Sequence, residues 1–174
     1  MDMSRDPVVN VIYQGIKEPI VLCMQNNAER AALILLYASI DSLAKLGLPS
    51  DRESSTRNDY AAWCDKYLVF KSNCKVSGLE WYAARCGLLH NYTAESDLSN
   101  NGKVRMLSYY GDDNGSDIIY QPTESPDLVL VKTEKLIEAF YQALDSFVVD
   151  LYKNVDHSVI EKRFNKMFHL FTYE

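Results

Sequence analysis

The residues whose types could do chemistry gather in one short segment, Arg85-Cys86-Gly87-Leu88-Leu89-His90-Asn91-Tyr92. An arginine stays charged at physiological pH, can hold a phosphate group and can stabilise charge that develops on it. A histidine that titrates near neutrality can take a proton from a ribose 2′-hydroxyl or give one to a leaving oxygen. Arg85 and His90 together therefore predict cleavage of a phosphodiester bond without a metal ion.

The spacing of the two residues sets a condition on this chemistry. Arg85 and His90 are five positions apart, and in an α-helix that places their side chains about 140° apart. They converge only if the helix frays or bends at His90, or if a second copy of the chain completes the site. Gly87 and the expected helix end at Asn91 favour a bend. A glycine inside a helix also marks a close approach by another backbone or a ligand, and we expect Gly87 to lie at an interface.

Two acidic residues are candidates for supporting this pair. Asp41 lies near the end of an apolar helix, where it is either solvated at the helix edge or orients Arg85 or a histidine, since a buried carboxylate needs a partner. Glu80 closes the capping box Ser77-Gly78-Leu79-Glu80 and is the other candidate partner of Arg85. In a purely structural interpretation, Arg85 forms an ion pair with one of these acids and has no catalytic role. His90 then interacts favourably with the helix dipole at the C-terminus, and Tyr92 is a packing residue.

The remaining histidines, His157 and His169, are weaker candidates for catalysis. His157 lies at a predicted helix boundary, where capping is the usual role, and Arg163 with His169 repeats an R-x5-H spacing that we interpret as the exposed edge of a packing helix. Phosphate-binding loops, G-x-S-x-G and H-E-x-x-H patterns are absent from the sequence. The four cysteines show no C-x-x-C spacing. We therefore expect no metal site and no cofactor.

The elements that must position these residues are mostly helical. Apolar spacing, caps and breakers predict helices over 7–17 (a strand is the alternative there), 19–46, 59–70, 79–90, 133–153 and 158–171. The helix 19–46 is apolar nearly all round and belongs in the centre of a bundle. Thr133 or a neighbour is expected to cap the helix over 133–153. Segments 104–110 and 117–121 flank a turn and predict a β-hairpin, and 128–131 is the candidate for a third short strand.

These elements define the expected fold class. The fold is mainly α, a helical bundle of about five helices with a small β-hairpin inserted between the third and fourth long helices. At 174 residues the chain suits one domain, 1–174, with the insertion at about 103–131.

Charge and hydropathy limit the classes of partner that the chain is expected to bind. The net charge of −6 argues against a broad nucleic-acid-binding surface, but residues 57–85 hold five basic against three acidic side chains, so a polyanion would be met locally near Arg85. Ordinary surface scatter is the alternative explanation of that asymmetry. No apolar run is long enough to span a bilayer, and the N-terminus lacks the pattern of a secretory signal, so we expect a cytoplasmic protein without membrane contact.

The arrangement Arg85-x4-His90-x-Tyr92 resembles the R-x4-6-H signature of the HEPN superfamily, and is most similar to the R-x4-H-x-Y form of toxins paired with small nucleotidyltransferase antitoxins. The resemblance implies a helical bundle, a homodimer in which two motifs face each other, and metal-independent endoribonuclease activity in host defence or toxin–antitoxin systems. It assigns catalytic roles to Arg85, His90 and Tyr92, the tyrosine being the residue that the antitoxin modifies with nucleotides. The chain departs from the family in having Cys86, where a polar residue often follows the arginine, and in its β-hairpin.

Two further hypotheses stay open at this stage. The chain could be a non-catalytic HEPN-like module that binds nucleotides or a protein. It could also be an interaction protein that contacts a partner through its acidic hairpin, 104–121.

Overall fold

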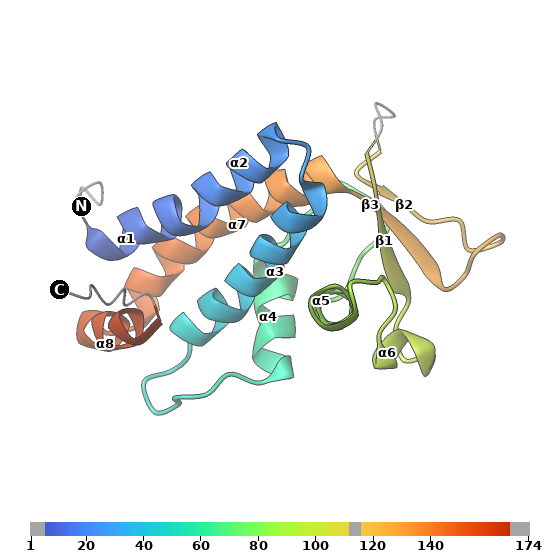
Figure 1. The fold of residues 1–174 in the computed structure, drawn as a ribbon. Helices are drawn as coiled ribbons and strands as arrows, with labels where there is room; N and C mark the ends of the chain where they lie inside the picture. Colours follow the sequence, from blue (N-terminus) through green and yellow to red (C-terminus); the bar gives the residue numbers. More distant parts are fainter. Residues whose placement is uncertain (1–5, 112–115, 168–174) are drawn as a thin grey trace.

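The computed structural model describes residues 6–111 and 116–167, and these form a mainly helical fold with a small sheet at one end (Figure 1). The predicted fold class is therefore confirmed. The helices are α1 (Pro7–Ile12), η1 (Tyr13–Lys17), α2 (Glu18–Gln25), α3 (Glu29–Leu46), α4 (Arg57–Tyr67), α5 (Gly78–Cys86), η2 (Gly87–Asn91), α6 (Asp97–Asn100), α7 (Thr133–Asn154) and α8 (His157–Met167), where η marks a π-helical turn. The strands are β1 (Met106–Tyr110), β2 (Ile118–Ile119) and β3 (Leu128–Lys132).

The N-terminal helices differ from the prediction in where they break. Asp6 caps α1 by accepting from the backbone N–H groups of Val8 and Val9, and helical structure then runs on through η1 and α2 to Gln25. Helix α2 begins at Glu18, where the sequence indicated a restart, but the chain stays helical through this point because proline is tolerated in the first turn of a helix. The predicted single helix over 19–46 is wrong. Asn27 takes a left-handed conformation with φ of 56° and separates α2 from α3, which asparagine tolerates better than most residues.

The core lies between α3 and α7, with the aromatic side chains of α4 between them. Trp63 of α4 contacts the rings of Phe140 and Phe147 of α7. Helix α3 is not buried all round, as its pattern had indicated: Ala31, Leu35 and Ala38 line an exposed face, with Leu35 37% exposed. Burial on one side only makes α3 a flank of the bundle, so the side chains along its exposed edge can take part in a site.

The arm formed by α1, η1 and α2 lies beside α7 (Figure 1). Tyr152 of α7 donates to Asp6 at 2.8 Å, and the Tyr13 hydroxyl donates to Asp145. Helix α8 extends to Met167, so the predicted end at 171, together with His169, falls outside the described residues. None of the helices in the described ranges is both long and apolar enough to cross a membrane.

The sheet corrects the predicted hairpin. The strand order is β1-β3-β2, with β1 parallel and β2 antiparallel to β3. The turn signal after Tyr110 correctly indicated a change of direction but not the pairing, and the turn residues 112–115 are outside the described part. Strand β3, Leu-Val-Leu-Val-Lys, is the most continuously apolar of the strands and takes the central position, as buried central strands do.

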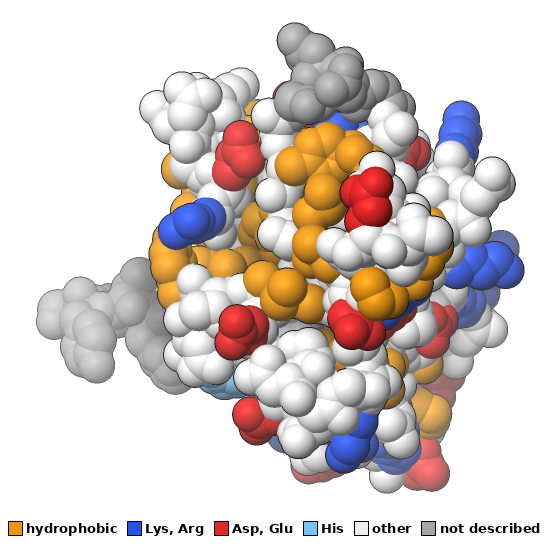
Figure 2. Space-filling view, turned by 90° about the vertical axis from the view of Figure 1, so that its right-hand side faces the viewer, with side chains coloured by type: hydrophobic (Ala, Val, Ile, Leu, Met, Phe, Trp, Pro, Cys, Tyr) orange, Lys and Arg blue, Asp and Glu red, His pale blue; other side chains and the backbone are white. Residues whose placement is uncertain are grey.

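One face of the sheet is covered by the helices and the other faces outward. Leu107, Val129 and Val131 are at most 1% exposed and pack into the core. Figure 2 views the end of the molecule that carries the sheet, where apolar side chains gather near the middle with acidic side chains between them. Basic side chains lie mainly along the right-hand edge and at the bottom of this view (Figure 2).

Candidate functional site

Arg85 is placed by a helix with a well-defined start. The Ser77 hydroxyl accepts from the Glu80 N–H at 3.3 Å, and the Glu80 carboxylate accepts from the Ser77 N–H at 2.7 Å, which is the predicted capping box at the start of α5. Gly78 lies directly against α4, since a Cβ there would stand 1.9 Å from the carbonyl oxygen of Ala61. The cap and this contact fix both the register and the position of α5, and Arg85 lies in its last turn.

Asp41 holds the Arg85 side chain in place. Arg85 Nε and Nη2 donate to the same oxygen of Asp41, Oδ2, at 2.9 Å and 2.7 Å. Burial alone would lower the pKa of Arg85, but the hydrogen bonds and charge of Asp41 outweigh it and keep the pKa of the guanidinium above its usual value. Of the two roles considered for Asp41, the structure therefore places it as the partner that orients Arg85.

A π turn brings His90 back to Arg85. Residues Gly87–Asn91 form η2, in which i→i+5 hydrogen bonds replace the i→i+4 bonds of the α-helix. The wider turn places residues five apart near each other, and Arg85 Nη1 lies 3.1 Å from His90 Nε2. The bend that is needed for Arg85 and His90 to converge is thus present within one chain.

Gly87 explains why the helix changes its period here. A Cβ at this position would stand 2.5 Å from the carbonyl oxygen of Glu95 and 2.8 Å from that of Thr93. The close approach was expected, but the partner is the chain's own segment after η2 rather than a ligand or a second copy. Gly87 is buried by that segment, so the expectation that it lies at an interface is not met.

Tyr92 ends the π turn, and its ring contacts Arg30. It has a left-handed backbone, with φ of 57° and ψ of 30°. Its side chain is 55% exposed, and the guanidinium of Arg30 on α3 lies 5.4 Å from the ring centre. Tyr92 is therefore near His90 in the chain but faces Arg30.

The hydrogen-bond partners of the Glu80 carboxylate are residues other than Arg85. Its carboxylate pairs with Arg105, which donates from Nε at 2.6 Å, and with the capping residue Ser77. Burial would raise the pKa of Glu80, but these hydrogen bonds outweigh it and keep the pKa below its usual value. Glu80 joins α5 to the segment before β1 and supports the site only through the position of α5.

The second R-x5-H match has a structural explanation. Arg163 is only 9% exposed and donates to the carbonyl oxygens of Leu48, Pro49 and Arg52. It therefore fastens the loop after α3 onto α8, and the prediction that it forms an exposed edge is wrong. His157, at the start of α8, lies 3.5 Å from Glu161 and 3.8 Å from Asp6.

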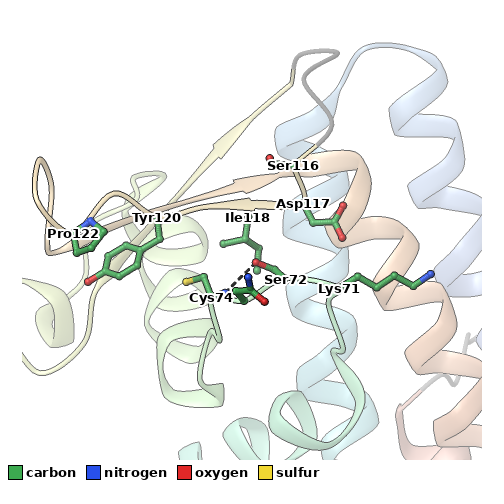
Figure 3. A pocket seen from close by; sticks show the side chains of 9 residues that line it. Lys71, Ser72, Cys74, Ser116, Asp117, Ile118, Tyr120 and Pro122 are labelled. Carbon is green, nitrogen blue, oxygen red and sulfur yellow. Dashed lines mark hydrogen bonds between the residues drawn. The ribbon is translucent and has the colours of Figure 1, made fainter.

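Another hollow lies elsewhere in the fold. It has a volume of about 620 Å³ and is lined by Lys71, Cys74, Asp117 and Tyr120 among others, from the loop after α4 and the segment around β2 (Figure 3). In the close-up Lys71 extends away from Cys74 and Tyr120 (Figure 3). None of the residues predicted from the sequence lines this hollow. Within the described ranges no cluster of three or more His, Cys, Asp or Glu side chains could hold a metal ion.

A smaller hollow, about 260 Å³, lies beside Tyr92 and contains residues that sequence reasoning missed. Arg30 and Glu29 line it from α3, and Thr133 lines it from the start of α7. The sequence predicted that Thr133 or a neighbour caps α7. The N-cap position is held by the neighbouring Lys132, which forms no side-chain capping bond. No local motif marks Arg30 or Thr133, because they meet Tyr92 only through tertiary packing.

Comparison with known proteins adds no relative to this description: no protein-family model, curated protein or solved structure matches the chain. The functional argument therefore depends on the site itself, an arginine–histidine pair oriented by an aspartate at the edge of a helical bundle.

Proposed function

We propose that this protein is a HEPN-like, metal-independent endoribonuclease that acts as a homodimer, as a toxin or defence component. The observation that carries the proposal is the 3.1 Å contact between Arg85 Nη1 and His90 Nε2. The guanidinium is already oriented by Asp41, and His90 is exposed on an open turn. A phosphate ligand and a proton-transfer group are thus side by side, as in-line phosphodiester cleavage requires.

The contact also suggests how the reaction starts. Arginine only donates hydrogen bonds, so the contact is a hydrogen bond in the tautomer of His90 whose Nε2 accepts and whose ring proton is on Nδ1. When the scissile phosphate takes the Nη1 donor of Arg85, Nε2 becomes available to the ribose 2′-hydroxyl. His90 then accepts that proton as the 2′-oxygen bonds to phosphorus. The bond to the 5′-oxygen breaks, and this oxygen takes a proton from a general acid, leaving a 2′,3′-cyclic phosphate.

Tyr92 is assigned two roles in this proposal. Its exposed ring shapes the approach of RNA to His90, and its hydroxyl is open to modification. A small nucleotidyltransferase that transfers a nucleotide to Tyr92 would place bulk and negative charge beside His90 and so repel RNA. Such an enzyme, encoded by a neighbouring gene, is the antitoxin that the proposal implies.

The test is cleavage of structured and unstructured RNA in EDTA by the purified protein. We expect cyclic-phosphate ends, and a loss of at least ~100-fold in rate for His90→Ala and Arg85→Ala. His157→Ala is the matched control, because it removes an exposed histidine from α8 and should leave the rate unchanged. No cleavage by the wild type, or cleavage that persists in His90→Ala, would exclude the nuclease.

The alternative is a non-catalytic HEPN-like module that binds nucleotides or a protein. The hollow beside Tyr92 supports nucleotide binding over protein binding in this alternative. Neither Arg85 nor His90 lines this hollow, so a nucleotide could bind there without the catalytic pair. Nucleotide binding without turnover, unaffected by His90→Ala, would support this alternative.

A further inference from the structure

The hollow beside Tyr92 has the size of a site for one small planar group. Its volume of about 260 Å³ is below the ~300–1,000 Å³ of pockets that enclose drug-sized ligands. Leu33 and Leu88, 2% and 6% exposed, form its apolar side. Glu29, Arg30 and Tyr92 form its exposed side. An apolar floor with charged and aromatic side chains at the opening suits a ligand that is flat and has a polar edge.

The Thr133 hydroxyl beside the hollow lacks a hydrogen-bond partner among the described residues. The residue is 1% exposed and lines the hollow, yet its Oγ1 has no hydrogen-bond partner among the described residues. A buried hydroxyl without a partner is unfavourable, because it has lost its hydrogen bonds to water. In a helix, threonine is divided between two χ1 rotamers, so a rotation that exchanges Oγ1 with the methyl group gives a ligand access to the hydroxyl.

The exposed side provides stacking and hydrogen-bonding groups together. The Tyr92 ring is 55% exposed and faces the guanidinium of Arg30, with 5.4 Å between the guanidinium carbon and the ring centre. Glu29, the residue before Arg30, adds carboxylate acceptors beside Gly111. Unpaired RNA bases are recognised by this combination, an aromatic or guanidinium face for stacking and polar groups for the base edge.

We infer that this hollow binds one unpaired nucleobase of an RNA strand whose backbone passes the Arg85–His90 pair. The base stacks on Tyr92, and its polar edge reaches Thr133, Glu29 and Arg30. Arg30 and Asp41 are about three helical turns apart and so lie on the same flank of α3, which aligns the hollow with the site along one strand. The inference rests on the proposed function for its substrate class, and it makes Tyr92 a determinant of base recognition.

Binding can be measured without cleavage in the full-length His90→Ala protein. The probes are the four nucleoside 5′-monophosphates and ribose 5-phosphate, titrated by NMR or calorimetry. We expect at least one mononucleotide to bind and ribose 5-phosphate to bind at least ~5-fold more weakly, because it lacks the base that stacks. Adding Thr133→Val, which keeps the shape and removes the hydroxyl, should weaken the mononucleotide by about 3- to 10-fold. Tyr92→Ala should weaken it by at least ~5-fold, and Tyr92→Phe should restore it.

The controls separate recognition from folding and from the nuclease. Thr133→Val should leave the melting temperature equal or higher, since the hydroxyl has no partner, and Thr123→Val changes an exposed threonine outside the hollow and should have no effect. No mononucleotide binding, equal binding of ribose 5-phosphate, or affinity unchanged by Thr133→Val overturns the inference. If the wild type still cleaves RNA in that case, only the base site fails. If base binding is present but cleavage is absent, only the nuclease fails.

Discussion

Asp41 is the residue that orients the Arg85 guanidinium, which is the phosphate ligand of the proposed nuclease. Both of its bonds to Arg85 end on Oδ2, at 2.9 Å and 2.7 Å, so the guanidinium is held by one side while Nη1 faces His90. Asp41 acts through Arg85 and is therefore a positioning residue, with effects that should differ from those of removing Arg85 itself.

We predict that Asp41→Asn lowers kcat by about 10- to 100-fold, because a misplacement of the order of 1 Å can cost roughly 100-fold in rate. The Michaelis constant should stay the same or fall, since a guanidinium without its counter-charge still attracts phosphate. Steady-state cleavage of a short RNA gives both constants. Asp51→Asn, in the exposed loop after α3, is the control and should change neither, and a rise in the Michaelis constant at unchanged kcat would contradict the positioning role.

Gly87 is the second residue on which the geometry depends. We predict that Gly87→Ala destabilises the protein by about 1–3 kcal/mol, because its Cβ would collide with the backbone of Glu95 and Thr93, which cannot move as a side-chain tip could. Urea denaturation measures this change. Gly15→Ala in the other π turn is the matched control: its Cβ would meet only Val11 at an ordinary 3.6 Å, so its stability should be equal or higher. Equal effects of the two substitutions would argue against the close approach at Gly87.

At the scale of elements, local signals predicted what local forces determine. The capping box at Ser77 correctly marked the start of α5, and the apolar spacing from Leu136 to Leu151 correctly gave α7. The π turn could not be predicted, because a single widened turn barely changes the apolar period and depends on packing of Gly87 against residues 93–95. The strand order was missed for a related reason: a turn signal gives the direction of the chain but not which strand is most buried. Asn27 was a signal that could have been used, since asparagine commonly ends helices.

The pair formed by Glu80 and Arg105 joins two elements, and its contribution should depend on pH. The pKa of Glu80 is lowered in the folded state, so its stabilisation is present above the unfolded pKa of about 4.3 and is lost as the pH falls through the folded value. We predict that Glu80→Gln costs about 2 kcal/mol at pH 7 and that this difference shrinks between pH 5 and pH 3. Urea denaturation at each pH tests it. Glu138→Gln, from the exposed pair with Lys135, should change little at either pH. A difference that stays constant with pH would exclude the charged pair as its source.

At the scale of the whole molecule, the open question is how one histidine could supply both proton transfers. Cleavage by a 2′-hydroxyl needs a base at that oxygen and an acid at the leaving 5′-oxygen. Among the residues that the structure describes, His90 is the one histidine in contact with Arg85 in each chain. A homodimer that places two such pairs on one RNA solves this problem. The exposed face of α3, with Ala31, Leu35 and Ala38, is an apolar surface on the helix that carries Asp41. We propose that the dimer forms through this face.

We therefore predict that inactive subunits inhibit active ones. With a tenfold excess of His90→Ala subunits, random pairing leaves roughly one wild-type subunit in ten with a wild-type partner, so activity per wild-type subunit should fall about tenfold. The control is the double variant Leu35→Lys, His90→Ala. Because a charge on the exposed face of α3 opposes apolar contact, this variant should remain monomeric by light scattering and should not inhibit. Undiminished activity in the presence of excess His90→Ala subunits would mean that each chain cleaves alone, with a group other than a second His90 as the acid.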